Sequence, residues 1–316
     1  MYFEVCSRQR MVKNRHSANR LIAEVDFAAP TDTVASVEVL SLAELRVRGS
    51  GGALTAPRRP TFHHLLTVQR GHLWHTVDFT GHVLEPGTWL WIRPGQVHQW
   101  HDLTTAEGTL ILFEAEVLDP TTAQIAALNS THAPVVHTPT GDSRVATNLA
   151  LKHLQTEFQL ARRASTPLHV AILGHLLAAL VLRLTDTSHA VGTPAGEHPA
   201  TFLKFRDAVD AHFDRTRRVN DYADMLGYSP RTLSRATMAA AGVGAKEFID
   251  RRVLLESKRL LAHGDQSAAQ ISSQLNFSSP TNFSKFFQER TGDSPLQFRR
   301  SARGDIAVRQ RPSSTG

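Results

Sequence analysis

The sequence has very little cysteine, since Cys6 is the only one in 316 residues. A single thiol excludes a framework of internal disulfides and is typical of a protein from a reducing compartment. Residues 1–20 also lack the continuous apolar segment of a secretory signal peptide and instead carry scattered basic side chains. We therefore expect a cytoplasmic protein with a flexible N-terminal arm.

Long hydrophobic runs are also missing. The most apolar stretch, 168–184, is interrupted by His169, His175 and Arg183. It falls short of the ~20 apolar residues that a membrane-spanning helix needs. We expect a buried or dimer-forming helix there and no membrane partner.

Positive charge is unevenly distributed along the chain. Residues 200–302 hold 16 Lys and Arg against 11 Asp and Glu, a net +5, whereas the whole chain has a net charge of +6. Nearly all the excess therefore lies in the last third, where neutralising phosphates would release counterions. This distribution favours a nucleic acid as the partner of that region.

The same region contains an internal repeat. Three landmarks recur at a separation of 50 residues, namely Leu233 and Phe283, Gly242 and Gly292, and Phe248 and Phe298. Each copy is typical of a helix-turn-helix, although one copy alone would fit an ordinary helical hairpin equally well. Two copies at one offset, with basic surfaces, favour DNA binding.

In the first copy, Ala223 is small enough for a close helix crossing, Gly227 suits the turn, and Leu233 anchors the second helix. Ser229 is the predicted cap of that helix and Pro230 its first residue. The predicted DNA-contacting residues of this copy are Arg231, Thr232, Ser234 and Arg235.

The second copy repeats this pattern with Ser272 as the small residue, Asn276 at the turn and Ser278 or Ser279 as the cap. Asparagine tolerates the left-handed backbone conformation better than most residues, so we expect the turn to survive. Its predicted DNA-contacting residues are Thr281, Asn282, Ser284 and Lys285. Residues 246–263 contain no Gly or Pro and predict one continuous helix that fixes the spacing of the two motifs.

The N-terminal half differs in pattern. Short apolar runs separated by Gly and Pro over 34–118 predict a small antiparallel barrel, and three- and four-residue periodicity over 143–186 predicts a following helical pair. The fold class is thus α+β, with a cupin-like barrel and an all-α domain. We predict a flexible arm at 1–20, a sensor and dimerisation domain at 21–186, a linker at 187–200, a DNA-binding domain at 201–302 and a disordered tail at 303–316.

Residues 201–300 resemble the C-terminal domain of the arabinose-regulator (AraC/XylS) family of bacterial transcription factors. The resemblance includes the closing string Gly-Asp-Ser-Pro-Leu-Gln-Phe-Arg at 292–299. It implies a homodimeric regulator of a DNA operator that recruits RNA polymerase, more commonly as an activator. The chain departs from the family at Asn276, where glycine is usual, at Ser272, where alanine is usual, and at Ala236-Thr237, where an aromatic residue is common. We expect the last departure to loosen the packing behind Arg235.

The string from Arg70 to Trp100 resembles the sensor cupin of the same family. This resemblance implies that Arg70, His98 and Trp100 face a small-molecule effector. Trp89, Trp91 and Arg93 share one face of their strand and are rival pocket residues, and core packing is the favoured role for the two tryptophans. An arginine, an imidazole and an indole can hydrogen-bond and stack on a polar ligand.

Histidines in the same region raise the question of a metal. His72 and His75 are three residues apart, which places them on opposite faces of a strand, so we expect no metal and no other cofactor. We expect a regulator and not an enzyme. The alternatives are a cupin-type metalloenzyme fused to a DNA-binding domain and an architectural DNA-binding protein without a ligand.

Overall fold

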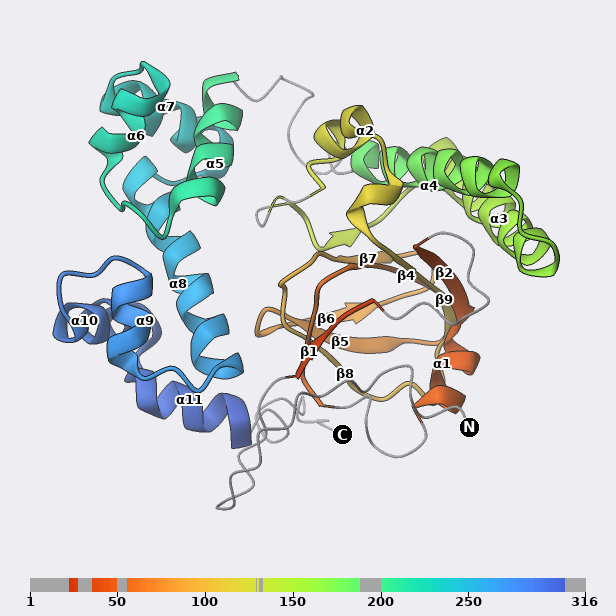
Figure 1. Cartoon of the computed structure of the whole chain (residues 1–316), viewed down its shortest axis with the longest axis horizontal. Coiled ribbons are helices and arrows are strands. Elements are labelled where there is room, and N and C mark those ends of the chain that lie inside the picture. The colour runs from red at the N-terminus through yellow and green to blue at the C-terminus, as the bar shows by residue number, and fades with distance from the viewer. Residues whose placement is uncertain are drawn as a thin grey trace. The chain divides into compact units, whose positions relative to one another are not determined.

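The computed structural model describes residues 23–27, 36–49, 56–128, 130, 133–187 and 200–304. These residues fall into two compact units, one within 23–187 and one within 200–304 (Figure 1). The predicted arm, most of the predicted linker and the tail beyond Gly304 lie outside the described residues.

Two five-stranded sheets form the N-terminal unit. The first has the order β1 (Ala23–Val25), β3 (Arg58–Pro60), β8 (His98–Trp100), β5 (Leu73–Val77) and β6 (Thr80–Leu84). The second has the order β10 (Val136–His137), β7 (Trp89–Ile92), β4 (His63–Arg70), β9 (Glu107–Phe113) and β2 (Val37–Ser41). All pairings between these strands are antiparallel except β1 with β3. No ladder joins the two sheets among the described strands, so the predicted barrel is an open double sheet.

Burial along the strands shows how the layers are built. Leu73, His75 and Val77 of β5 are buried, whereas the residues between them are half-buried, so β5 has one inward face. In β4 residues 63–68 are all buried. One face of β4 meets the core between the sheets, and the other meets the core shared with the helices.

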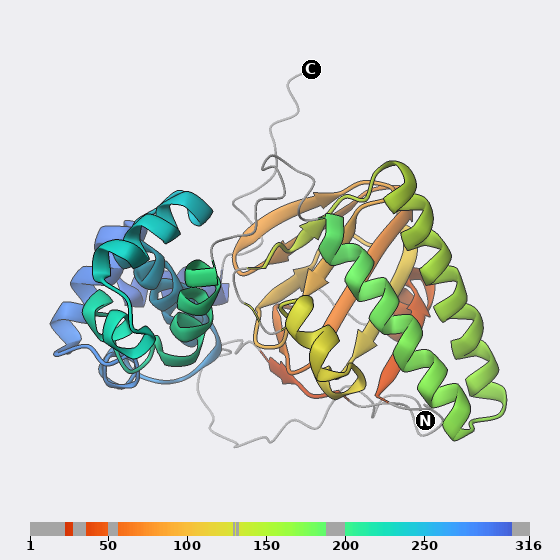
Figure 2. The ribbon, with the colours of Figure 1, turned by 90° about the horizontal axis from the view of Figure 1, so that it is seen from above.

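Two long helices, α3 (Gly141–Arg163) and α4 (Pro167–Thr187), lie side by side over the second sheet (Figure 2). Their core residues pack against Trp89, Trp91 and Phe113 of that sheet. The shorter elements of this unit are α1 (Leu42–Arg48), the 3-10 helix η1 (Ala115–Val117) and α2 (Pro120–Ile125).

Helix α4 corrects one expectation from the sequence. Over Pro167–Thr185 it is long and apolar enough to cross a membrane by length and composition alone, despite its two histidines and one arginine. A core helix of a globular unit passes the same test. Less than a third of this window is buried. Leu173, Leu177 and Leu180 pack fully against α3 and the second sheet, whereas the other side of the helix is half-buried or exposed, so the prediction of a buried or dimer-forming helix is met on one face only.

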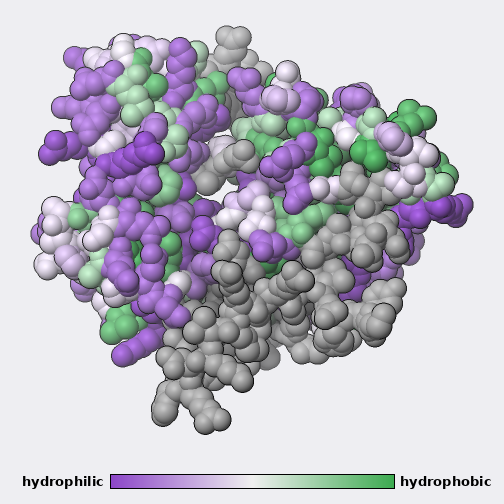
Figure 3. Space-filling view, in the orientation of Figure 1, coloured by the Kyte–Doolittle hydropathy of each residue, from purple (hydrophilic) through white to green (hydrophobic). Residues whose placement is uncertain are grey.

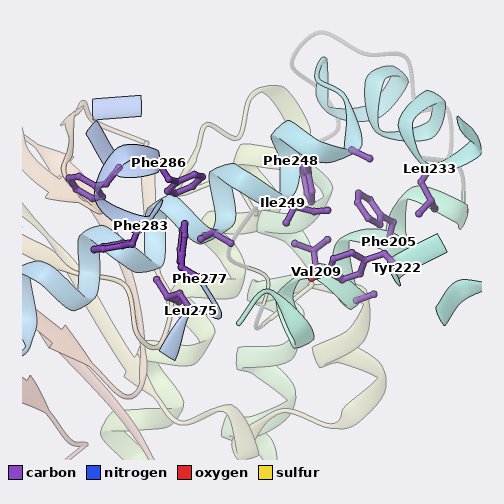
Figure 4. Packing of buried hydrophobic residues seen from close by; sticks show 14 of the residues in the cluster. Phe205, Val209, Tyr222, Leu233, Phe248, Ile249, Leu275, Phe277, Phe283 and Phe286 are labelled. Atoms are coloured by element: carbon purple, nitrogen blue, oxygen red, sulfur yellow. The ribbon is translucent and has the colours of Figure 1, made fainter. Parts of the chain in front are cut away.

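The C-terminal unit is all helical. Its helices are α5 (Ala200–His212), α6 (Val219–Leu226), α7 (Pro230–Ala241), α8 (Ala245–His263), α9 (Ala268–Gln274), α10 (Pro280–Thr291) and α11 (Pro295–Gly304). Figure 4 shows the buried side chains in two groups along α8, one around Phe205, Tyr222 and Leu233 and one around Phe277 and Phe283. Each group is the core of one helix-turn-helix, and α8 is the predicted continuous helix between them.

Candidate DNA-binding surface and effector site

The first turn, between α6 and α7, has the predicted geometry. Gly227 ends α6 with a φ of +68°, in the left-handed region that favours glycine. Ser229 caps α7, because its hydroxyl accepts a hydrogen bond from the backbone N–H of Thr232 at 3.1 Å, and Pro230 begins the helix.

The second turn reproduces this geometry with different residues. Asn276 takes the left-handed conformation at a φ of +54°, so the prediction that asparagine preserves the turn is confirmed. The cap of α10 is Ser279, which accepts from the backbone N–H of Asn282 at 3.1 Å. Two residues lie between Gly227 and Pro230 but three lie between Asn276 and Pro280, so the second turn is one residue longer.

The two recognition helices, α7 and α10, have matching exposure. Their anchors, Leu233 and Phe283, are completely buried. The predicted DNA-contacting residues of α7 are Arg231, Thr232 and Arg235, which are exposed, and Ser234, which is half-buried. Their counterparts in α10 are Thr281, Asn282 and Lys285, which are exposed, and Ser284, which is half-buried. The exposed side chains therefore lie away from the anchor and the two serines at its flank, and the contact of all eight with DNA stays a prediction.

Two of these side chains also take part in the turns. The Thr232 hydroxyl lies 2.8 Å from the Ser229 hydroxyl, and the Asn282 side-chain amide donates to the Ser278 hydroxyl at 2.7 Å. Lys285 Nζ lies 3.9 Å from Glu289 Oε1, and its side chain is 74% exposed. An exposed pair of this kind is weak enough to give way to a phosphate or a base.

The residues that replace the usual aromatic position of α7 are buried. Thr237 is inaccessible to solvent, and its hydroxyl donates to the Leu233 carbonyl at 2.7 Å. The corresponding positions in α10, 50 residues later, are Phe286 and Phe287. Aromatic residues near the first motif come instead from α5, α6 and α8, where the Phe205 and Tyr222 rings lie 5.7 Å apart.

Helix α8 connects the two motifs and carries buried charges. Its 19 residues correspond to a length of about 28 Å at ~1.5 Å per residue. Successive major grooves on one side of B-DNA lie roughly 34 Å apart, so a rod of this length suits two neighbouring grooves. Arg252 pairs with Asp210 of α5 at 3.1 Å and with Glu256 at 3.1 Å, which ties the rod to the first motif.

In the N-terminal unit, two of the three predicted effector residues come together. His98 and Trp100 of β8 are buried, with ring centroids 6.0 Å apart. His75 of β5 completes the group, since its Nε2 lies 3.1 Å from His98 Nδ1 and its ring is 4.5 Å from the Trp100 ring. Burial lowers the pKa of His98 to about 3, so this imidazole is neutral at physiological pH.

Arg70 does not join this group. Its side chain is 82% exposed and lies 3.7 Å from Glu107. Strand alternation from the inward-facing Val68 predicts that Arg70 also points inward. The ladder between β4 and β9 shifts register between Val68 and Arg70, and such an irregularity changes the face on which the next side chain lies.

His75 and His64 are members of this group that were not predicted from the sequence. His64 lies behind His98 with a centroid distance of 5.0 Å, and buried atoms His64 Nδ1 and His75 Nδ1 have no hydrogen-bond partner. The spacing of His72 and His75 could have indicated His75, because only one of the two can face inward, and His72 is exposed. Among the residues that the structure describes, no cluster of three or more His, Cys, Asp or Glu side chains is arranged to hold a metal ion.

The rival residues Trp89, Trp91 and Arg93 face away from the His98 group. Both tryptophans are buried in the core beneath α3 and α4, which agrees with a packing role. Arg93 is 3% exposed, its guanidinium carbon lies 4.3 Å from the Trp91 ring centroid, and it donates to the Pro134 carbonyl at 3.0 Å. Burial lowers the pKa of Arg93 to about 9.

Comparison with known proteins matches both units. A model described as an AraC-like ligand binding domain matches residues 48–192, and a model described as a helix-turn-helix domain matches residues 222–301. The regulatory protein PocR of Salmonella typhimurium is 28% identical over 102 residues, which are 32% of this chain and 34% of PocR. An uncharacterised HTH-type transcriptional regulator of Staphylococcus aureus is 27% identical over 93 residues, which are 29% of this chain and 12% of that protein.

The matched segments thus span about a third of PocR and about an eighth of the staphylococcal regulator. Among solved structures, ToxT from Vibrio cholerae is similar at 10% identity and a TM-score of 0.41, covering 78% of this chain and 92% of that one. The two family models together cover more than half of the chain, one on each unit. The chain belongs to the arabinose-regulator (AraC/XylS) family of transcription regulators.

Proposed function

We propose that this chain is a sequence-specific transcription regulator that binds DNA through α7 and α10 and a small-molecule effector through its N-terminal unit. The observation that carries the proposal is the matched pair of capped recognition helices, each with its exposed polar face opposite a buried anchor. A DNA-binding regulator works where the chromosome is, so we expect it in the cytoplasm. RNA polymerase is the further partner if the protein is an activator.

DNA binding is tested with duplexes that the protein selects from a random pool. We expect a defined motif to be enriched, and Arg235→Ala and Lys285→Ala each to weaken binding roughly tenfold or more. The matched control is Arg251→Ala, since Arg251 is an exposed arginine of α8 outside the recognition helices. Selection of no motif would favour the architectural alternative. Unchanged gel-shift affinity of both recognition-helix variants at physiological salt would reject the assignment.

The salt dependence of binding separates two roles for the first motif. If Arg235 contacts only a phosphate, Arg235→Ala lowers the slope of log affinity against log salt by about one and weakens all sequences alike. If it contacts a base edge, the variant loses preference at one position of the selected motif. The proposal of sequence-specific binding through α7 requires the second result for at least one of the α7 side chains.

The effector site that we propose lies between the sheets at His98 and Trp100, with His75 beside them. Neutral imidazoles can both donate and accept hydrogen bonds to a small polar ligand, and the indole N–H can donate one. Thermal shifts with sugars, aromatic acids and amino acids test it, since a ligand of the folded state raises the midpoint. We expect the shift from an active compound to disappear in His98→Ala and to persist in Arg70→Ala.

A homodimer is proposed from the outer face of α3 and α4. Val145, Leu149 and Leu160 of α3 are 59%, 54% and 43% exposed, and Leu168 of α4 is 68% exposed. Spacings of 4 and 11 residues place the three α3 side chains on one helix face. Figure 3 shows hydrophobic surface gathered over these helices. Light scattering should give a dimer for the wild type and a monomer for Leu149→Lys combined with Leu160→Lys.

A further inference from the structure

Asn276 makes a contact that its counterpart in the first motif cannot make. Both Asn276 and Gly227 have left-handed backbones at the end of the first helix of their motifs. The Asn276 side-chain amide donates a hydrogen bond to the backbone carbonyl of Arg215, which lies 61 residues earlier in the segment between α5 and α6. A side chain in the second turn is therefore attached directly to the first motif.

Arg217 strengthens the same junction. Its guanidinium carbon lies 3.6 Å from the centroid of the Phe277 ring and 5.8 Å from that of Phe286 in α10. Phe277 also packs against Phe283, the anchor of α10, at a centroid distance of 5.3 Å. The segment between α5 and α6 thus covers the aromatic core behind the second recognition helix. Partial burial lowers the pKa of Arg217, and the carboxylate of Asp250 opposes that shift.

The other side of α10 is held by α8. Arg290 of α10 donates to Asp250 of α8 at 2.6 Å, and its guanidinium carbon lies 4.3 Å from the Phe286 ring centroid. Asp250 is almost fully buried and also accepts from Lys246. Helix α10 is therefore held from two directions, by the rod α8 and by the segment that carries Arg215 and Arg217.

The contacts with α8, including Arg290 with Asp250, hold the second motif from one side only. Four residues, 264–267, separate α8 from α9, and rotation there would move α10 relative to α7. We propose that the brace, formed by Arg215, Arg217, Asn276 and Phe277, fixes the separation of the two recognition helices and so selects the spacing of the two DNA elements. This inference rests on the proposed DNA binding through α7 and α10.

The test uses the full-length protein and its selected duplex, with the spacing between the two contact elements changed by one to three base pairs. Asn276→Asp keeps the shape and the tolerance of the left-handed backbone but removes the donor, and Asn276→Gly removes the side chain without changing charge. We expect each variant to lose about three- to tenfold affinity at the preferred spacing and little at other spacings. The spacing profile, which is the affinity as a function of the spacing, should therefore become flatter. Affinity for a duplex with a single element should not change.

Two further variants complete the experiment. Asn220→Asp adds the same charge at an exposed position of α6 and should keep the wild-type spacing profile. Arg217→Met keeps the apolar stem but removes the guanidinium from Phe277, and it should flatten the profile as the Asn276 variants do. Circular dichroism establishes that each variant is folded before binding is measured.

The possible results are distinguishable. If the wild type binds no specific duplex, the proposed function fails and the inference fails with it. If the wild type prefers one spacing and the Asn276 variants keep the same profile, the inference alone is overturned. A wild-type protein that binds its motif with no spacing preference also overturns the inference and leaves sequence-specific binding intact.

Discussion

The N-terminal and C-terminal units bury polar side chains in different ways. The buried charges of α8 are paired with opposite charges, as in Arg252 with Asp210 and Glu256 and in Asp250 with Arg290. The buried polar residues of the N-terminal unit include the histidines His63, His64, His75, His98 and His137. A buried ion pair requires its two charged groups to stay in contact, whereas a neutral imidazole can exchange one hydrogen-bond partner for another. The core with paired charges in the C-terminal unit therefore suits a fixed DNA-binding geometry.

Because their buried polar residues differ, the two units should also differ in their response to acid. Burial lowers the pKa of His63 and of His98 to about 3 and that of His137 to about 4. No histidine is buried among the described residues of the C-terminal unit. Acid should therefore act first on the N-terminal unit, while loss of a charged side chain should be most damaging in the C-terminal unit.

The largest predicted effect is a loss of stability of the N-terminal unit in acid. The pKa of an imidazole is near 6.5 in the unfolded state. Where folding lowers that pKa, the imidazole binds fewer protons in the folded state than in the unfolded state. Stability is therefore complete above pH 6.5 and falls as the pH drops toward 3–4. The expected loss is about 1.4 kcal/mol per imidazole for each pH unit, or about 4 kcal/mol at pH 5 from His63 and His98 together.

Tryptophan fluorescence measures this effect in the full-length chain, because all four tryptophans lie between residues 74 and 100. The denaturant concentration at the unfolding midpoint, followed by fluorescence, should decrease when the pH is lowered from 7 to 5. His98→Asn is the control and should reduce the pH dependence by removing one titrating group. A fluorescence midpoint that stays constant over this range would contradict the prediction.

An effect of comparable size is expected in the C-terminal unit from Glu256→Ala. Glu256 accepts from Arg252 at 3.1 Å and lies 3.5 Å from Arg259, and both arginines are buried. Removing one partner of a buried ion pair costs about 3–5 kcal/mol. Helical circular dichroism should report the loss, and tryptophan fluorescence should not. Glu247→Ala, which breaks the exposed pair with Arg251, is the control and should cost less than about 0.5 kcal/mol.

The smallest effect should come from Arg93→Met in the N-terminal unit. Within the described residues no carboxylate pairs with this buried guanidinium, and its Nε has no hydrogen-bond partner. Removing an unpaired buried cation relieves its desolvation cost, which offsets the lost contacts with Trp91 and the Pro134 carbonyl. We expect a change in unfolding free energy below about 1 kcal/mol by tryptophan fluorescence. A loss as large as that of Glu256→Ala would remove the contrast between the two units.

Much of the C-terminal unit could be predicted from sequence because its signals are local. The serine caps, the prolines after them and the left-handed turn at Asn276 act within three or four residues. The continuous helix was predicted from 246 and begins at Ala245. The contact of Asn276 with Arg215 was not predictable, since the two residues are 61 positions apart and no local pattern connects them.

The effector site was less predictable. Alternation along a strand correctly separates His72 from His75, but it fails at Arg70, where the register shift after Val68 depends on pairing with β9. The approach of His75 to His98 depends on the pairing of β5 with β8, which the sequence does not encode locally.

The amino-acid sequence by itself determined the double motif, its caps and turns, its recognition faces and the helix that joins the two copies. These features follow from short-range periodicity, backbone preference and capping. Only the tertiary structure decided which polar groups meet: His75 with His98, Arg290 with Asp250, and Asn276 with the carbonyl of Arg215. These contacts join residues that are far apart in the sequence. The packing of distant segments decides which buried donors and acceptors come within hydrogen-bonding distance of one another.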